Sequence, residues 1–486
     1  MRSAASAAPV TNVPHPENDV RYVLVNGTIA HMDKPTRNQE TRTILAIGLP
    51  LTAAYVAEMG MMITDMIIVG RLGSNELAAV GLTADWFYVL LLLGMGVVSI
   101  VGVLAAQNFG AGNQEGIANS VEQGVIAATI MSVPVMLSVW YLGPVLSHAK
   151  QDPEVIRLIT DYSRPLTWGV LPALWFVVLR NFVTALARSS VIMIITAAAL
   201  LLNLALNYTL VFGKFGFPAL GVTGAGYGTT IVNWLMFLSL ASHVIRSDYF
   251  RQYRFSMLPR RIHYETLKEI FVLGLPITVT QMLNGATFTV AAILVGMISA
   301  DILAAQMIAY SVIYFALSSS VGLGDAARVR VAYGIGTRSA DAARQAAYIS
   351  FVLAGVAVLI CSAVLWVLPE LLVGIFLDID DVANAAVLGT ALGLSVYAGW
   401  FLLFDGVLIV AANAIRGLRD TRTPLWISMA GYWGVGLGIG TWLCFPMNYG
   451  AKGLWLGLIL GAVFANVLMF WRFQVRLSQA ERRLIA

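Results

Sequence analysis

Charged residues are scarce in this chain of 486 residues. Lys, Arg, Asp and Glu make up 12% of it and hydrophobic residues 58%, whereas a soluble domain carries about 25% charge. This composition excludes the soluble classes and indicates a membrane protein. The formal net charge of +4 therefore does not predict nucleic-acid binding, because in a membrane protein the distribution of charge matters more than its sum.

Several chemical signatures are also missing. The five histidines are scattered without metal-ligand spacing, and the two cysteines, Cys361 and Cys444, lie inside apolar runs, which predicts buried small hydrophobic residues. No GxxxxGK[ST] motif occurs, and no basic segment leads into an apolar core that ends in a signal-peptide cleavage site. No His/Asp or Ser/His cluster stands at a helix end. The sequence predicts neither an enzyme, nor a metal site, nor a cofactor.

Long apolar stretches take the place of these features. About 20 apolar residues span a bilayer as a helix, and the absence of ten-residue alternation argues against a barrel. The expected fold is all-α, with twelve transmembrane helices. We expect them near residues 43–70, 77–107, 121–147, 157–182, 189–213, 220–245, 267–298, 302–331, 344–368, 383–414, 423–446 and 450–473.

The Lys and Arg residues predict the orientation. With the N-terminus inside, 24 of the 30 fall in the tails or in even-numbered connections, Arg180 and Arg188 after the fourth span among them. The positive-inside rule then predicts that both termini are cytoplasmic. Residues 1–42 are expected to form a cytoplasmic tail, mobile or lying on the surface, and residues 474–486 a second tail.

The chain repeats itself. Gly48-Leu49-Pro50-x-Thr52 recurs as Gly274-Leu275-Pro276-x-Thr278, a shift of 226 residues, and further matches follow in the same order. The basic connection 246–266 separates the two halves, so we expect an N-lobe over 43–245 and a C-lobe over 267–473. Because six helices is an even number, the halves have the same topology, and substrate sites in such proteins commonly lie between the lobes.

Two acids interrupt the first span. Glu58 and Asp65 are the only charges between Arg42 and Arg71, and seven residues bring them onto one helix face. An acid in hydrocarbon is costly and usually serves an ion or proton pathway. The pair favours proton uptake by one of its members, because two nearby carboxylates resist being charged together.

At this point the sequence resembles a known family, the multidrug and toxic compound extrusion (MATE) transporters, and in particular the NorM-type branch. The resemblance covers residues 43–473. Its motifs are GLP…TDMIIVGRLG in the first span, the Asn203-to-Gly226 region, the Ala414-to-Pro424 segment AIRGLRDTRTP, and GAKGLWLG at 450–457. It implies two six-helix bundles, a central cavity, and export of organic cations in exchange for protons or sodium, without a cofactor. A monomer in the bacterial inner membrane is the implied setting.

The resemblance also assigns candidate ion-coupling residues. Asp65 matches the acid of the first helix, Asn203 and Asn207 match its neighbours, and Asp405 matches the acid of the tenth. Sodium could bind at Asp65 and Asn207 or at Asp405. The chain departs from the family at Asn284, where many members have glutamate, and at Glu58, its repeat-mate, where glutamine is common. Glu58 is thus an additional N-lobe candidate.

Candidates for the substrate cavity are Asn284, Gln281, Tyr55 and Asp85. Asp325, close to Arg328 and Arg330, is expected in a structural ion pair, while the role of Asp85 stays open. All charges well inside the expected helices are acidic, which favours cationic ligands.

Four alternatives are weighed against a cation exporter. A flippase for lipid-linked sugars belongs to the same superfamily, but it usually has fourteen helices and a cationic cavity. A channel would more naturally be an oligomer than a duplicated chain, and an enzyme lacks its residues. An exporter dedicated to one metabolite is compatible with everything above.

Overall fold

The structure is a computed structural model that describes residues 22–25, 28–31, 36–148, 152–257, 261–378, 381 and 384–485. Most of the expected tail at 1–42 lies outside the described residues. Within it, β1 (Tyr22–Val25) and β2 (Thr28–His31) pair antiparallel. The first helix begins at Arg37, earlier than expected, because Thr36 and Gln39 form a reciprocal capping box at its N-terminus.

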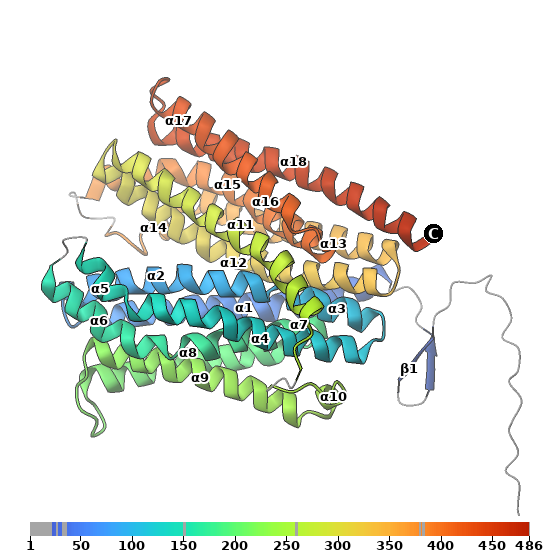
Figure 1. The fold of residues 1–486 in the computed structure, drawn as a ribbon. Helices are drawn as coiled ribbons and strands as arrows, with labels where there is room; N and C mark the ends of the chain where they lie inside the picture. Colours follow the sequence, from blue (N-terminus) through green and yellow to red (C-terminus); the bar gives the residue numbers. More distant parts are fainter. Residues whose placement is uncertain are drawn as a thin grey trace, which may run out of the picture.

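The first half of the chain forms one helical bundle, the N-lobe, drawn blue to green in Figure 1. Its helices are α1 (Arg37–Gly70), α2 (Ser74–Val98), α3 (Ile100–Gly110), α4 (Gln114–Trp140), α5 (Leu142–Ser147), α6 (Pro153–Thr167), α7 (Val170–Ala185), α8 (Ser190–Phe212) and α9 (Val222–Arg246). The short α10 (Asp248–Arg251) leads to the second half.

The second half forms the C-lobe, drawn yellow to red in Figure 1. It comprises α11 (Tyr264–Gly296), α12 (Ala300–Gly336), α13 (Ala340–Val367), α14 (Pro369–Val373), α15 (Ala385–Gly417), α16 (Arg422–Ser428), the π-helix η2 (Met429–Leu437), α17 (Gly438–Cys444) and α18 (Gly450–Ile485). The last helix continues through residues 474–485, which were expected as a tail.

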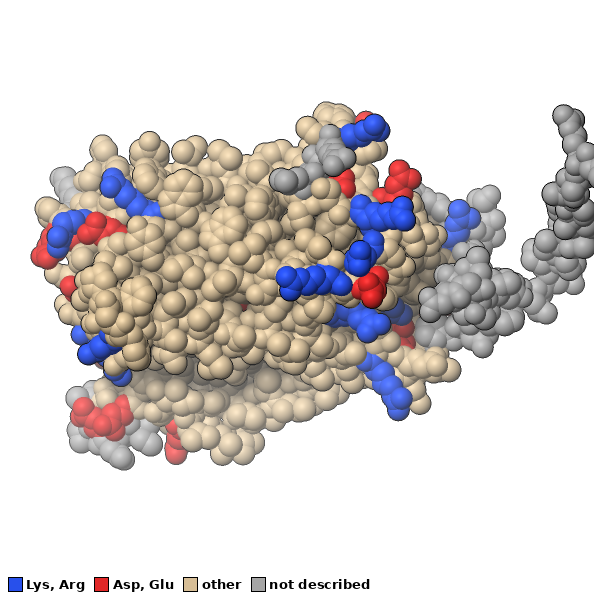
Figure 2. All heavy atoms as spheres, turned by 90° about the horizontal axis from the view of Figure 1, so that it is seen from below, with Lys and Arg blue, Asp and Glu red and all other residues tan. Residues whose placement is uncertain are grey.

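Ten helices of the described chain are long and apolar enough to cross a membrane, and the pair α6–α7, bent by 46°, makes eleven. The expected span at 423–446 is the rod α16–η2–α17, whose helix type changes within the glycine-rich stretch MAGYWGVGL. The elements therefore agree with twelve crossings. Figure 2 shows charged atoms at the two ends of the molecule and a broad band between them that is nearly free of charge.

The sequence repeat is a structural repeat. Helix α1 ends at Gly70 and α11 at Gly296, while α3 ends at Gly110 and α12 at Gly336, both pairs 226 residues apart. The connections match too, since Ala187 and Arg419 both have left-handed backbone, with φ of 56° and 59°. The two halves of the chain therefore have the same order of helices and connections.

The repeated glycine motif forms the contact between the lobes. A Cβ atom on Gly274 of α11 would lie 2.6 Å from the Cα of Val97 in α2, and one on Gly48 of α1 would lie 2.9 Å from the Leu323 side chain of α12. The motif threonines add hydrogen bonds across the same contact: Thr52 donates to the carbonyl oxygen of Ser319 (3.5 Å) and Thr278 to that of Leu93 (3.0 Å). Glycine is needed here because helix backbones meet directly.

These contacts lie toward one end of the bundle, the end at which α1 begins and α18 ends, which we call the terminal face (right in Figure 1). Toward the opposite end, the same four helices carry large exposed apolar side chains. These are Met62, Ile63 and Ile67 of α1, Trp86 and Tyr88 of α2, Ile293 of α11 and Met297 directly after it, and Tyr314 and Phe315 of α12. The two lobes are thus joined on the terminal side.

Gly274→Ala is expected to destabilise the protein by about 1–3 kcal/mol, because the new methyl group overlaps the Val97 backbone. Gly285→Ala on the same helix is the matched control: no atom lies within 4 Å of its Cβ position, and alanine improves helix propensity. Thermal unfolding in detergent measures both. Equal midpoints for the two variants would contradict the close lobe contact.

Candidate functional site

Asp65 is buried in the N-lobe and held by neutral donors. The Asn207 side-chain amide of α8 donates to one of its carboxylate oxygens, and the Thr229 hydroxyl of α9 donates to the other over 3.1 Å. The side chain of Asp65 is 8% exposed. Within the described chain, no Lys, Arg or His lies within salt-bridge distance of it, so its charge can be satisfied only by hydrogen bonds or by an incoming cation.

Asn203 completes this cluster one helical turn before Asn207. Its side-chain oxygen accepts a hydrogen bond from the hydroxyl of Thr64 over 3.1 Å, and both asparagines are almost completely buried. The structure therefore brings together Asp65, Asn203 and Asn207, as the sequence predicted, and adds Thr64 and Thr229, which it did not.

Asp405 is the second buried acid without a cationic partner in the part of the chain that the structure describes. It lies in α15, is 5% exposed, and accepts a hydrogen bond from the hydroxyl of Tyr432 in the π-helix η2. A π-helical turn is a common feature of functional sites. Here it brings the tyrosine to the carboxylate.

Two unsatisfied carbonyl oxygens lie in the adjoining segment of α11. The side-chain oxygens of Gln281 and Asn284 are buried and have no hydrogen-bond partner. Trp433, next to Tyr432, donates its indole N–H to the backbone oxygen of Leu283 over 3.2 Å, which places this segment of α11 against η2. Buried acceptors without donors are costly, and a cation would satisfy them.

Aromatic rings pack beside this region. Phe288 of α11 contacts Tyr310 and Tyr314 of α12 and Phe401 of α15, with ring centroids 5.1, 5.5 and 5.7 Å apart. Tyr314 is 46% exposed. The faces of such rings attract organic cations.

Glu58 does not share a partner with Asp65. Its carboxylate forms a salt bridge of 2.8 Å with Arg180 of α7. The assignment of Arg180 to a connection was wrong: α7 continues to Ala185, and Arg180 is buried inside it. The expectation that only acids lie well inside the helices was wrong for Arg180 and also for Arg328, which is buried inside α12.

The remaining candidates lie in different places. The expected ion pair of Asp325 with Arg328 is confirmed at 2.9 Å. Tyr55 donates its hydroxyl to Asp325 over 2.6 Å and so lies in the joined part of the lobes. Asp85 is exposed on α2 beside Trp86, and no hydrogen bond or ion pair is found for it among the described residues.

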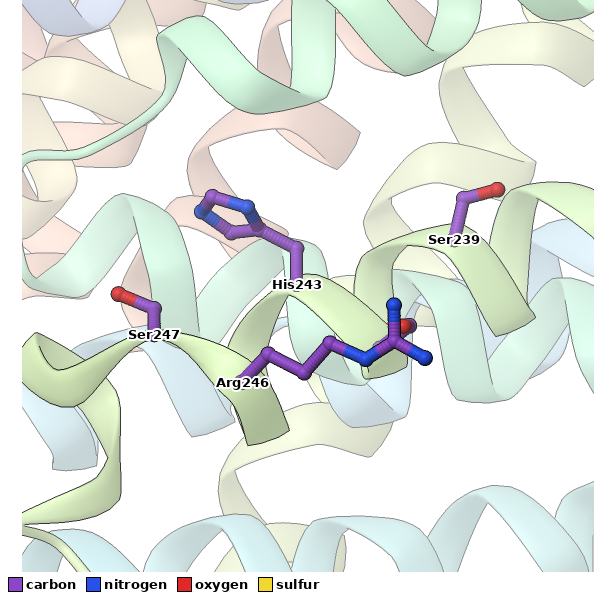
Figure 3. A pocket seen from close by; sticks show the side chains of 5 residues that line it. Ser239, His243, Arg246 and Ser247 are labelled. Carbon is purple, nitrogen blue, oxygen red and sulfur yellow. The ribbon is translucent and has the colours of Figure 1, made fainter.

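Two open hollows occur near the terminal face, away from both buried acids. The larger, about 450 Å³, lies at the end of α9 and is lined by Ser239, Ser242, His243, Arg246 and Ser247 (Figure 3). The other, about 400 Å³, lies beside Arg419 and Arg476. The described residues include no group of three or more His, Cys, Asp or Glu that could hold a metal ion.

Sequence reasoning missed Thr229, Tyr432 and Arg180. Hydroxyl side chains are frequent in membrane helices, so Thr229 and Tyr432 gave no signal of their own. For Arg180 a signal existed, because the apolar run LWFVVL precedes it and the apolar residues Phe182 and Val183 follow Asn181.

Asp420 fixes the position of residues 414–424, the segment AIRGLRDTRTP, at the terminal face. Burial disfavours the charge of Asp420, but hydrogen bonds from Arg472 and Thr423, together with the nearby charge of Arg476, hold its pKa below the usual range. Its carboxylate lies 2.7 Å from Arg472 and 3.0 Å from Arg476. This acid ties the connection between α15 and α16 to α18.

Known proteins similar to this chain are transporters. The family described as MatE matches residues 50–209 and 276–442. Proteins named "Probable multidrug resistance protein NorM" from Mesorhizobium japonicum and Synechococcus sp. are 33% and 34% identical to it. The first alignment covers 90% of this chain and 94% of the relative, and the second covers 92% and 96%.

Solved structures share the fold. The eukaryotic MATE transporter AtDTX14 superimposes with a TM-score of 0.80 at 20% identity, covering 92% of this chain and 99% of that one. A structure described as an outward-facing conformation of a multidrug resistance MATE family transporter gives 0.81 at 19% identity, with coverage of 92% and 97%.

Asp420→Asn is expected to lower stability at pH 7 by about 1.5–3 kcal/mol, because charge-assisted hydrogen bonds to Arg472 and Arg476 are lost. An acid whose pKa is depressed stabilises the fold above its ordinary pKa, about 3.9, and loses this contribution as the pH falls further. Thermal unfolding of wild type and variant should therefore differ most near pH 7 and converge below about pH 4. A difference independent of pH would contradict the charged interaction.

Proposed function

Because the chain belongs to the multidrug and toxic compound extrusion family, we propose that it exports lipophilic organic cations in exchange for protons entering the cell, by alternating access between its two lobes. The membership makes it a multidrug-type membrane transporter of small molecules. The direction, the coupling ion and the cationic nature of the cargo belong to the proposal.

The observation that carries the proposal is the pair of buried acids without basic partners, Asp65 in the N-lobe and Asp405 in the C-lobe. A buried acid that no arginine neutralises is costly unless it exchanges a proton or binds a cation. In the same membrane region, Glu58 and Asp325 are neutralised by arginines. The chain thus keeps two of its membrane acids free to react.

The surroundings of Asp65 favour a proton over sodium. Asn207 presents its amide nitrogen, and Thr229 its hydroxyl hydrogen, to the carboxylate. Donors stabilise an ionised carboxylate between proton transfers, whereas sodium sites in transporters are built from oxygen lone pairs. The side-chain oxygen of Asn207 is buried without a hydrogen-bond partner, and it is the oxygen that sodium would use here. Sodium remains the alternative for Asp65 with Asn207, and for Asp405.

The C-lobe offers a second cation site. Asp405 supplies charge, Gln281 and Asn284 supply unpaired oxygens, and the rings around Phe288 supply faces for an organic cation. Asp85, exposed on α2 where the lobes part, would attract the same cargo from the cavity. Tyr55 marks the bottom of that cavity.

The lobe contact on the terminal side supports a state that is closed there and open at the opposite end. With cytoplasmic termini in a bacterial inner membrane, this would be an outward-open state of a monomer. Rocking the lobes about their contact would expose the cavity to the other side. A flippase for lipid-linked sugars, or export of one metabolite, is the alternative.

Purified protein in liposomes tests the function through efflux of a fluorescent organic cation, driven by either a pH gradient or a sodium gradient. We expect transport with the pH gradient, and at least a tenfold loss in Asp65→Asn, because a neutral amide cannot exchange the proton. Asp301→Asn, at the exposed start of α12, is the matched control and should transport normally.

Two other outcomes would change or refute the proposal. Drive by sodium, lost in Asp405→Asn but not in Asp65→Asn, would move coupling to the C-lobe. If folded wild-type protein shows efflux under neither gradient, cation export is refuted and the flippase is favoured.

Asp85→Asn is expected to raise KM for a dicationic substrate more than for a monocationic one, by severalfold against less than twofold, with Vmax retained. The reason is that removing one cavity charge weakens attraction in proportion to the charge of the cargo. Uptake into inverted vesicles at several substrate concentrations measures this. An equal effect on both substrates would argue against a place in the cavity.

A further inference from the structure

Six side chains on three helices form a ring through the joined part of the lobes, linked by four side-chain contacts and, along α1 and α7, by the backbone. On α1, Tyr55 and Glu58 are three residues apart; on α12, so are Asp325 and Arg328; Arg180 and Asn181 are neighbours on α7. The ring runs from Tyr55 to Asp325 (2.6 Å), to Arg328 (2.9 Å) and to Asn181 (3.2 Å). It then passes through Arg180 to Glu58 (2.8 Å) and along α1 back to Tyr55. It crosses from one lobe to the other twice.

The opposite charges of the ring pair within a lobe. Glu58 and Arg180 both belong to the N-lobe, with side chains 27% and 7% exposed, and Asp325 and Arg328 both belong to the C-lobe, with side chains 14% and 5% exposed. Each pair is complete without the other lobe. If the lobes separated, no buried charge of the ring would lose its counter-charge.

The two bonds between the lobes each join a charged group to a neutral one. The Tyr55 hydroxyl donates to Asp325, and Arg328 donates to the side-chain oxygen of Asn181. Breaking such a bond costs far less than separating a buried ion pair. Tyr55 has a further contact, because the Arg180 guanidinium lies over its ring at 5.0 Å. One side chain therefore links the ion pair of the N-lobe to that of the C-lobe.

The ring lies at the level of the glycine contact. Tyr55 follows Thr52 by one helical turn on α1, away from the terminal face. Helix α12 runs in the opposite direction, so Asp325, one turn after Gly322, lies on the terminal side of that glycine. Among the residues that the structure describes, the repeat contains no second ring. The positions that correspond to Tyr55 and Glu58 at the shift of 226 are Gln281 and Asn284, which are neutral and have unpaired oxygens. The ring is therefore a one-sided device within the joined part of the lobes.

From this geometry we infer that the ring is a reversible latch between the lobes and that Tyr55 and Asn181 are its releasable members, positioning residues for the transport cycle. The latch holds the terminal side closed, and it opens by losing two hydrogen bonds while both ion pairs persist. The inference rests on the proposed alternating access, but its test does not depend on transport.

The test is a distance measurement between the lobes at the terminal face. Spin labels are placed at Gln114 and Asp341, exposed at the starts of α4 and α13, in a chain whose Cys361 and Cys444 are replaced by alanine. Double electron–electron resonance then gives the populations of short and long distances. Tyr55→Phe keeps the ring face for Arg180 and removes only the hydroxyl. We expect it to raise the ratio of long to short distances about ten- to a hundredfold, which corresponds to one lost hydrogen bond to a charged group, and Asn181→Leu to shift it the same way.

Tyr310→Phe is the matched control. It removes a buried tyrosine hydroxyl that accepts a hydrogen bond from Gln306 of the same helix, entirely within the C-lobe, and should leave the distances unchanged. A Tyr55→Phe distribution identical to that of wild type would overturn the latch, as would an equal shift in Tyr310→Phe.

Transport separates the latch from the proposed function. In protein that exports the cation, Tyr55→Phe should change Vmax at least twofold while KM stays within the error of wild type, because the latch acts on the conformational step. If the wild type does not transport under either gradient, the proposed function fails, yet the distances still decide on the latch. If the distances do not respond while transport is normal, the latch fails alone.

Discussion

The two lobes are held together by a contact that only glycine permits. At Gly274 and Gly322 one helix approaches the facing helix so closely that a β-carbon would meet the backbone of Val97 or of Thr52. Lipid tails are as apolar as leucine, so such helices associate through close packing and hydrogen bonds. The motif threonines provide those bonds. Everything between the lobes, including the cavity that we propose, takes its position from this contact.

A second constraint is the cost of charge in the membrane, which the chain meets in two ways. Glu58 and Asp325 are neutralised by arginines from the same lobe. Asp65 and Asp405 receive only neutral donors from asparagine, threonine and tyrosine. The first arrangement fixes a charge in place, whereas the second leaves it able to react with a proton or a cation. This difference is the physical basis for separating structural acids from proposed coupling acids.

The lobes are alike in backbone and unlike in chemistry. Helix ends and left-handed connections recur at matching positions, while the polar side chains do not. The N-lobe holds Asp65 among hydrogen-bond donors and contributes the Glu58–Arg180 ion pair to the ring. The C-lobe positions that correspond to Tyr55 and Glu58 are Gln281 and Asn284, whose side-chain oxygens have no hydrogen-bond partner. Duplication supplied a symmetric scaffold, and substitution made its two halves different. A proton site in one lobe and a cargo site in the other fit that asymmetry.

Much of this could be predicted from the sequence because the signals are local. Apolar runs placed the helices to within several residues, the shift of 226 revealed the repeat, and the spacing of Asn203 and Asn207 placed both on one face of α8. The errors arose where a local signal was ambiguous. An arginine near a helix end, such as Arg180, is equally compatible with a connection and with a buried position. Glu58 was paired with Asp65 because both lie on one face of α1, but a neighbouring helix, α7, supplies Arg180 as the partner of Glu58.

The sequence by itself determined that the chain crosses a membrane many times, that its halves repeat, and that acids interrupt the spans, since composition and periodicity depend only on neighbours along the chain. Only the tertiary structure decided which acid meets an arginine and which meets an amide. That choice depends on how α7, α8, α9 and α12 pack around α1. Partners 122 to 270 residues away in the chain, such as Arg180 for Glu58 and Asp325 for Tyr55, leave no mark on local sequence.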